Sequence, residues 1–142
     1  MLASELMSGS IVSITPDDTA LEASRLLERC NIGALLVCDT GGSMRGIVTD
    51  RDIVTRCLAC ERDPAQTTVR EIMSKSVLSV SPGDDIREVG HKMAINRVRR
   101  IPVAENGYPV GIITLGDIAG TQGYSKETSA TLAEISSNFS RL

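Results

Sequence analysis

The sequence of 142 residues has almost no aromatic side chains: it contains no tryptophan, one phenylalanine and two tyrosines. Sites that stack nucleic-acid bases need aromatic rings, so this class of site is excluded. A single histidine leaves too little material for a histidine-rich metal centre or a Ser-His-Asp catalytic triad. The net charge of −3 also argues against a general nucleic-acid-binding protein.

Long apolar runs are missing as well. No stretch reaches the roughly 18 apolar residues of a transmembrane helix. The first residues lack the basic and then apolar pattern of a secretory signal. We therefore expect a cytoplasmic protein that binds neither a membrane nor nucleic acid.

The sequence contains four cysteines, Cys30, Cys38, Cys57 and Cys60. The first three fall in apolar helical or strand-like patterns, where free cysteine commonly behaves as a small buried hydrophobic residue. We interpret all four as reduced thiols of a cytoplasmic protein. Cys57 and Cys60 form a C-x-x-C pair with no second pair nearby, which favours a structural role and leaves metal or redox use as the alternative.

One unit occurs twice in the chain, with its copies about 65 residues apart. The matches fall at turn residues and at chemically distinctive residues rather than at random, which indicates an internal duplication. Residues 5–8 match residues 71–74, residues 11–16 match residues 77–82, and residues 46–53 match residues 111–118.

The pattern of each copy predicts the element order β-α-β-β-α, after a short helical piece that carries Met-Ser. Thr19 and Asp85 are suited to cap a helix, with Glu22 and Glu88 completing a capping box. Residues 61–67 contain a proline and predict a surface linker. The expected strands are residues 11–15, 34–38 and 46–49, then 77–81, 101–104 and 111–114; the expected helices end near residues 29 and 95, and further helices open at residues 50 and 115.

A single copy of about 60 residues buries too little surface to be comfortably stable alone. Two copies packed together would share one aliphatic core. The sequence therefore predicts an α+β fold, built from a β-α-β-β-α repeat of the α/β type, with the two repeats packed as a pseudo-twofold pair. A cleft between repeats is a common place for a ligand.

A strand-to-helix corner recurs with the pattern Gly, two aliphatic residues, Thr, two variable residues and Asp. The glycine allows a backbone or a ligand to approach closely, and the threonine lies beside free helix N–H groups, which favour an anion. The aspartate can accept two hydrogen bonds, which suits the cis-diol of a ribose. Thr-x-x-Asp is also an ordinary helix cap, so both interpretations stay open. The residues are Gly46, Thr49 and Asp52 in one copy and Gly111, Thr114 and Asp117 in the other.

These features resemble a tandem pair of CBS domains, often called a Bateman module. The resemblance covers roughly residues 2–120 and rests on the repeat, the corner motif, the Met-Ser of each lead-in and the Arg-Arg-Ile-Pro-Val run at residues 99–103. It implies a first CBS repeat over residues 1–62 and a second over residues 68–122. We expect residues 123–142 to form a C-terminal tail, with a possible short helix at residues 132–135.

The resemblance implies a regulatory module, not an enzyme, that binds AMP, ADP, ATP or a related adenosyl ligand and assembles as a homodimer. It places the ribose hydroxyls on Asp52 and Asp117, with Thr49 and Thr114 near the ribose or phosphate. The backbone around Ile32 and Val98–Arg100 would meet the adenine edge. Thr15 and Ser81, with their neighbours in the first extended strands, would line the base pocket.

The two corners are not equivalent in sequence. Arg51 lies at the first corner where the second has Gly116, and Arg97, Arg99 and Arg100 lie together in the second copy. Arginine binds phosphate oxygens through a fork of donors, so these residues are candidate contacts for a polyanionic ligand. Solvated surface charge is the alternative for Arg97 and Arg99, and an inter-subunit salt bridge is a further reading for Arg100.

The leading hypothesis is an adenine-nucleotide sensor whose occupancy changes the population of arrangements that an unidentified regulated protein, or the dimer itself, responds to. The alternative is a structural or interaction module without ligand binding. An enzyme is not expected, because the sequence lacks a Walker-type loop, a nucleophile–base pair and a metal constellation.

Overall fold

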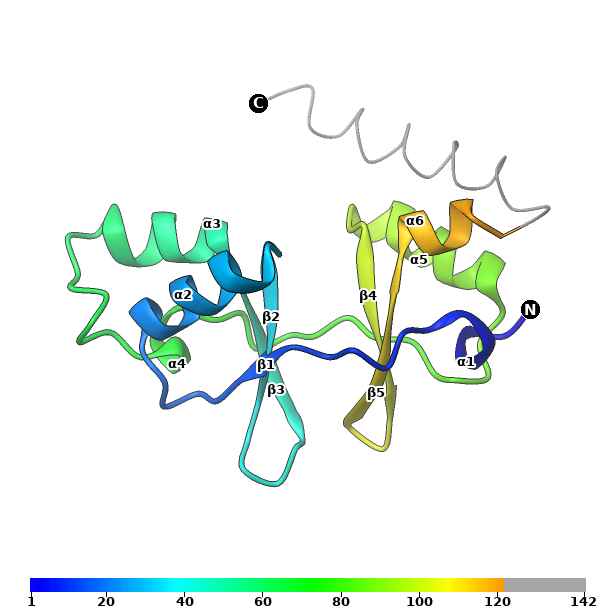
Figure 1. Ribbon diagram of the computed structural model, residues 1–142, viewed down its shortest axis with the longest axis horizontal. Helices are drawn as coiled ribbons and strands as arrows, with labels where there is room; N and C mark the ends of the chain where they lie inside the picture. The colour runs from blue at the N-terminus through cyan, green and yellow to red at the C-terminus, as the bar shows by residue number, and fades with distance from the viewer. Residues whose placement is uncertain (122–142) are drawn as a thin grey trace. The chain divides into compact units, whose positions relative to one another are not determined.

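The computed structural model describes residues 1–121, and the chain divides into two compact units (Figure 1). The first-repeat unit is Val12–Val77. The second-repeat unit joins Met1–Ile11 to the chain from Leu78 onward. The tail expected at residues 123–142, with its short helix, lies outside the described residues.

The first-repeat unit has a three-stranded sheet of order β1-β2-β3, in which β1 runs parallel and β3 antiparallel to β2. Helices α2 and α3 pack against each other and against these strands. The elements are β1 (Ser13–Ile14), α2 (Ala20–Cys30), β2 (Ala34–Cys38), β3 (Met44–Thr49), α3 (Asp50–Ile53), which continues into the π-helix η1 (Val54–Leu58), and α4 (Val69–Ile72).

The second-repeat unit repeats the helix-strand-strand-helix part of this order but has no counterpart of β1, and its sheet is an antiparallel pair, β4 and β5. The two-residue turn between them has Asn106 and Gly107 both at positive φ, as a tight hairpin requires. The mixed helix and strand content predicted from the sequence is confirmed in both units. The elements are α1 (Ala3–Leu6), α5 (Ile86–Asn96), β4 (Arg100–Glu105), β5 (Tyr108–Thr114) and α6 (Leu115–Ala119).

The extended segment expected at residues 77–81 does not become a strand. It makes a single parallel bridge, between Val80 and Val103. In the first copy the N–H of Leu36 donates to the carbonyl of Val12 and lengthens the ladder. The equivalent of Leu36 in the second copy is Pro102, which has no N–H to donate, and the pairing therefore stops after one bridge.

The two short helices α1 and α4, each with the residues just after it, are the lead-ins of the first and second repeats. Each lead-in packs with the other repeat: α1 with the second and α4 with the first. Ser8, after α1, exchanges two 2.9 Å backbone hydrogen bonds with Ile112 of β5. Ser74, after α4, exchanges two bonds of the same length with Ile47 of β3. The compact units therefore exchange their lead-ins relative to the sequence repeats, whose limits were placed at residues 1–62 and 68–122.

The segment expected to be a surface linker, residues 61–67, is part of the first-repeat unit. Thr67 is only 3% exposed. Its carbonyl accepts a 2.8 Å hydrogen bond from the N–H of Ala20, and the carbonyl of Pro64 accepts from Leu21. These bonds satisfy N–H groups of the first turn of α2, so this segment is held against the helix and is not a free linker.

The caps expected for the two long helices form at Thr19 and Asp85. The side chain of Thr19 accepts from the N–H of Glu22, and that of Asp85 accepts from the N–H of Arg87. Within residues 1–121 the helices that start after Thr19 and Asp85 show these caps but not the reciprocal bond expected from Glu22 and Glu88. The pKa of Asp18 is lowered, mainly by the hydrogen bond from the Thr15 N–H.

Each unit has its own aliphatic core. Cys38 and Cys57 are buried, whereas Cys30 and Cys60 are exposed, and all four are free thiols. No helix within residues 1–121 is long and apolar enough to cross a membrane. The fully buried large side chains are Leu35, Val37, Val48, Val69 and Ile72 in the first-repeat unit and Ile86, Val89, Met93, Ile101, Ile113 and Ile118 in the second.

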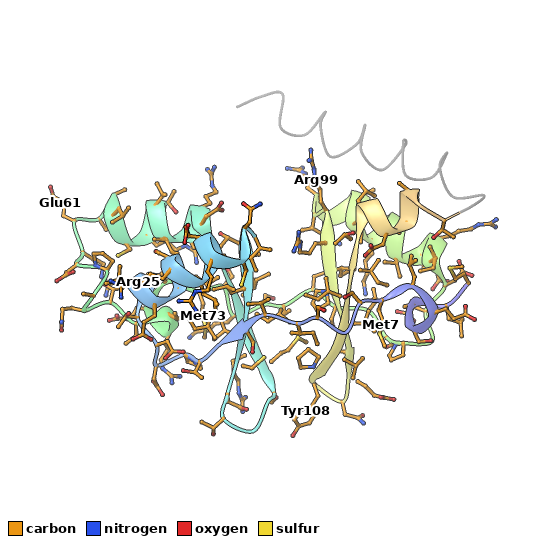
Figure 2. All side chains as sticks on the ribbon, viewed as in Figure 1. Met7, Arg25, Glu61, Met73, Arg99 and Tyr108 are labelled. Carbon is orange, nitrogen blue, oxygen red and sulfur yellow. The ribbon has the colours of Figure 1, made fainter. Side chains whose placement is uncertain are left out.

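The glycine that opens each corner motif is the contact point of a lead-in. A Cβ on Gly46 would lie 2.5 Å from the backbone oxygen of Ser74. A Cβ on Gly111 would lie 2.5 Å from the Sδ of Met7 and 2.9 Å from its Cβ. Met7 and Met73 are labelled in Figure 2. Because these glycines have no side chain, the lead-in segments can pack directly against β3 and β5.

We expect Gly46→Ala to lower the free energy of unfolding by about 3 kcal/mol and Gly111→Ala by about 2 kcal/mol. The difference arises because the first clash is with backbone and the second with a side chain. Urea unfolding followed by circular dichroism measures both. Met7→Ala should restore part of the loss in Gly111→Ala. Gly83→Ala is the control, since its Cβ would meet nothing within 4 Å, and equal losses at all three glycines would contradict this interpretation.

Candidate functional site

The first corner is formed where β3 ends and α3 begins. The Oγ1 of Thr49 accepts a 3.1 Å hydrogen bond from the N–H of Asp52, and the Oδ2 of Asp52 accepts a 2.9 Å bond from the N–H of Thr49. The N–H of Asp50 donates to the carbonyl of Gly33, which holds the corner beside the start of β2. Thr49 and Asp52 therefore hold each other in position.

The second corner has the same geometry at the junction of β5 and α6. The Oγ1 of Thr114 accepts from the N–H of Asp117 at 3.1 Å, and the Oδ2 of Asp117 accepts from the N–H of Thr114 at 2.8 Å. The helix-capping interpretation of Thr-x-x-Asp is thus confirmed in both copies. Each cap uses one carboxylate oxygen, Oδ2, and leaves the other for a further contact.

The surroundings of the other carboxylate oxygen differ between the corners. The Oδ1 of Asp52 lies 3.8 Å from the Nε of Arg56. The same guanidinium donates to the carbonyl of Ile72 at 3.0 Å. Thr121 occupies the position equivalent to Arg56, and its hydroxyl donates to the backbone carbonyl of Asp117. Within residues 1–121 no cation pairs with Asp117, so its negative charge is not neutralised locally.

Arginine residues lie next to the second corner, at the start of β4. Arg100 lies directly opposite Thr114 in the β4–β5 pair, and the carbonyl of Arg99 accepts from the N–H of Leu115. Arg99 and Arg100 are exposed, as is Arg97, whose backbone caps α5 in the left-handed conformation. Figure 2 shows Arg99 at the α6 end of β4. None of the three makes an ion pair in the part of the chain that the structure describes, which leaves their donors available to an anion.

The first corner lacks this set of cations. Gly33 and Ala34 take the places of Arg99 and Arg100, and Ala34 lies opposite Thr49. Arg51 is exposed on α3, where its N–H donates to the carboxylate of Asp50. The asymmetry expected from the sequence is therefore a difference in charge at two corners of equal geometry.

Two of the expected site residues lie away from the corners. Ile14 lies opposite Val37, which puts Thr15 level with Cys38, whereas Thr49 lies opposite Ala34. Four residues of strand separate these levels, about 13 Å along the sheet. Thr15 instead donates its N–H to Asp18 in the turn before α2.

Ser81 occupies the equivalent place in the second-repeat unit. It follows Val80, which bridges to Val103, whereas the corner lies at the level of Arg100. Its N–H donates to Asp84. The structure thus groups Thr114 and Asp117 with the start of β4 and does not bring Ser81 to them.

Ile32 and Val98 precede β2 and β4 at the corner ends of these strands. Both are half-buried against their cores, and their N–H groups donate to the carbonyls of Leu27 and Met93. Gly46, with Gly111, faces the lead-in segments, as described above. The close approach that each glycine allows is made in this structure by protein, not by a ligand.

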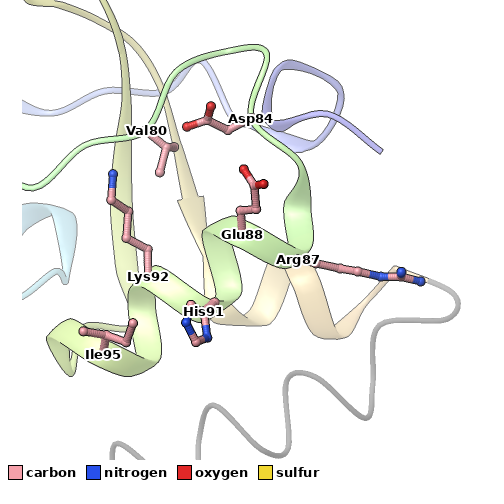
Figure 3. Close-up of a pocket in the computed structure, with 7 residues that line it drawn as sticks. All are labelled: Val80, Asp84, Arg87, Glu88, His91, Lys92 and Ile95. Carbon is pink, nitrogen blue, oxygen red and sulfur yellow. The ribbon is translucent and has the colours of Figure 1, made fainter.

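A groove along α5, which sequence reasoning missed, has a volume of about 390 Å³ (Figure 3). A related groove of about 340 Å³ follows α2. Each groove contains an aspartate and a glutamate one helical turn apart, such as Asp84 and Glu88 in the α5 groove. Aligning the two repeats would have shown that this acidic pair occurs in both copies. Lys92 in the α5 groove donates to the carbonyl of Ser79. Residues 1–121 hold no group of three or more His, Cys, Asp or Glu side chains placed to bind a metal ion.

The CBS domain family model matches residues 3–59 and 69–122. The chain therefore belongs to the CBS-domain family and carries two CBS domains, which confirms the resemblance seen in the sequence. A pair of CBS domains is typically a regulatory module, and such modules often bind nucleotides.

Individual relatives cover most of the chain. CBS domain-containing protein YhcV of Bacillus subtilis (strain 168) is 34% identical over 132 residues, 93% of each chain. The crystal structure of Hypoxic Response Protein I with two coordinated zinc ions is 32% identical, with a TM-score of 0.76 over 84% of this chain and 97% of that one. The CBS domain pair of protein MJ0100, in complex with 5′-methylthioadenosine and S-adenosyl-L-methionine, is 28% identical, with a TM-score of 0.72 over 84% and 93%.

We expect Asp52→Ala and Asp117→Ala each to lower the free energy of unfolding by about 1 kcal/mol, because each removes an acceptor from a half-buried N–H group. Asp52→Asn and Asp117→Asn keep an acceptor oxygen and should stay within about 0.5 kcal/mol of the parent. Urea titration measures all four. If the alanine variants are as stable as the asparagine variants, the carboxylate does not contribute to the cap.

Proposed function

We propose that this protein is a regulatory module that binds an adenosine-containing ligand, AMP, ADP, ATP or a related adenosyl compound, and that the second corner is its principal binding site. Asp117 would hold the ribose hydroxyls, with Thr114 beside the ribose or phosphate. Arg99 and Arg100 would meet the charged tail of the ligand. In this role the protein binds the ligand and does not transform it.

The observation that carries this proposal is the Oδ1 of Asp117, which pairs with no cation among residues 1–121. The cap fixes the side chain through Oδ2, so the group is positioned without loss of its second acceptor. At Asp52 the same oxygen already faces Arg56. A ribose diol donates two hydrogen bonds, and it would compete with a guanidinium at the first corner but not at the second.

The cations support the choice of a phosphorylated ligand. Arg100 is directly opposite Thr114, and Arg99 precedes it at the same end of β4. Guanidinium groups bind phosphate oxygens through paired N–H donors. The adenosyl ligands of the related MJ0100 pair support the nucleoside part of the proposal. The arginines favour a tail with negative charge.

Isothermal titration of AMP, ADP, ATP and S-adenosylmethionine tests the site. We expect Asp117→Asn to weaken binding at least about tenfold, because a charged acceptor is lost, and Asp52→Asn to weaken it less than about threefold. Arg100→Gln should weaken the binding of ATP more than that of S-adenosylmethionine, which carries no phosphate. The asparagine variants keep the cap, so a loss of affinity is not a loss of folding.

Three results would contradict the proposal. Binding by Asp117→Asn as tight as the parent's would remove the ribose role, and a larger loss in Asp52→Asn would move the site to the first corner. If none of the four ligands binds, the chain is an interaction module without ligand binding.

A second part of the proposal concerns assembly: the chain acts as a homodimer, and ligand occupancy shifts the population of arrangements that a regulated protein binds. Val54 and Leu58, one turn apart on η1, are 54% and 52% exposed. Exposed aliphatic side chains of this kind gain from being covered in an interface.

Light scattering coupled to size exclusion should give the mass of a dimer for the parent and of a monomer for Val54→Glu/Leu58→Glu, since two buried charges oppose association. Ile95→Glu is the matched control, because Ile95 is 59% exposed on α5. A monomeric parent would refute the homodimer, and a dimer disrupted only by the control would place the interface on α5.

A further inference from the structure

A second hollow lies in the first-repeat unit, and we call it the cationic groove. It has a volume of about 420 Å³, and its lining residues come from three separate parts of the chain: the turn before α2, the β2–β3 hairpin and the second lead-in. Arg45 lies four residues before Thr49 on β3, about 13 Å along the strand, so the groove is separate from the first corner. The lining residues are Pro16, Asp39, Arg45, Arg70, Met73 and Lys75.

Carboxylates hold the two guanidinium groups of the groove in place. The Nε and Nη2 of Arg45 lie 2.8 and 2.7 Å from the Oδ2 of Asp39. The Nη2 of Arg70 lies 2.9 Å from the Oδ1 of Asp17. Arg45 and Arg70 remain 59% and 57% exposed, and each guanidinium has five N–H donors. Both therefore keep donors for another acceptor.

Asp39 is itself fixed as an anion. Its Oδ1 accepts a 3.0 Å hydrogen bond from the N–H of Ser43. This bond, followed by the one from Arg45, holds the pKa of Asp39 below its ordinary value. The ionised carboxylate is held by Ser43 and orients Arg45.

Lys75 is the third cation, and it is exposed. Its ammonium group makes no ion pair within the described 121 residues. Three cations thus line a groove with two carboxylates, Asp39 in its lining and Asp17 paired with Arg70, in a protein whose net charge is −3. The excess of positive charge is local and does not follow from the composition of the chain.

The internal repeat provides a comparison at the same fold positions. The second-repeat unit keeps the acid, with Glu105 in the place of Asp39. It replaces Arg45 with Val110, and the exchanged lead-in supplies Ser4 and Gly9 where the first-repeat unit has Arg70 and Lys75. Because that unit folds without these cations, the fold does not require them.

We propose that the cationic groove binds a small, multiply charged anion of the phosphate class, either free or as part of a phosphorylated metabolite. Paired arginine donors and a lysine suit phosphate oxygens, and Pro16 and Met73 offer an apolar contact for an attached organic group. The groove volume falls within the range of small-molecule sites, roughly 300–1,000 Å³. A protein partner would need about 800 Å² of surface, more than the groove supplies.

Titration with inorganic pyrophosphate at low ionic strength, followed by amide NMR shifts of the full chain, tests this proposal. We expect saturable shifts at Arg45, Arg70 and Lys75 with a dissociation constant below about 1 mM. Lys75→Gln and Arg45→Gln should each weaken binding at least about fivefold. Arg29→Gln removes an equal charge from α2 of the same unit and should change binding less than about twofold.

The outcomes separate this site from the adenosyl site. Asp117→Asn should leave the pyrophosphate shifts in the groove unchanged, and Lys75→Gln should leave the binding of S-adenosylmethionine, which carries no phosphate, unchanged. The proposal is overturned if the parent shows no saturable shifts in the groove, or if Arg29→Gln weakens binding as much as Lys75→Gln. It is also overturned if a glutamate-rich peptide binds there with the same variant dependence and pyrophosphate does not.

Discussion

The backbone pairing between each lead-in and a strand edge is the constraint on which both units depend. Ser74 with Ile47 and Ser8 with Ile112 form reciprocal hydrogen bonds beside a glycine that has no room for a side chain. This pairing covers an edge of β3 and of β5 that would otherwise expose its N–H and C=O groups. It also brings Arg70 and Lys75 to the first-repeat unit, so the cationic groove exists only because the lead-ins are exchanged.

The Thr-x-x-Asp corners have the same cap in both copies but different surroundings. The cap satisfies a backbone N–H with one carboxylate oxygen, and the neighbours of the other oxygen distinguish the two corners. Arg56 faces that oxygen in the first copy, whereas Thr121 bonds the backbone in the second. Two corners of the same geometry therefore differ in charge, and a duplicated fold gains two chemically distinct surfaces.

Local sequence patterns predicted the elements well where the signal is local. The caps at Thr19 and Asp85 and the turn at Asn106 depend on residues a few positions apart, and the structure has them. The prediction of a strand at residues 77–81 was wrong, because its pairing with β4 needs a backbone N–H from a residue far away in the chain. That residue is Pro102, which has no N–H to donate. The linker expected at residues 61–67 does lie mostly at the surface, but its packing on α2 does not follow from its own sequence, because the N–H groups that bond its carbonyls lie far away in the chain.

By itself, the sequence determined the family, the duplication, the order of the elements and the Thr and Asp of each corner, because these follow from spacing along the chain. Only the tertiary structure decided which repeat each lead-in joins, which carboxylate Arg56 faces, and how far Thr15 and Ser81 lie from the corners. These features depend on strand register and on contacts between residues far apart in the chain. A pattern of neighbouring side chains does not encode such contacts one by one, because they are set by how whole segments pack.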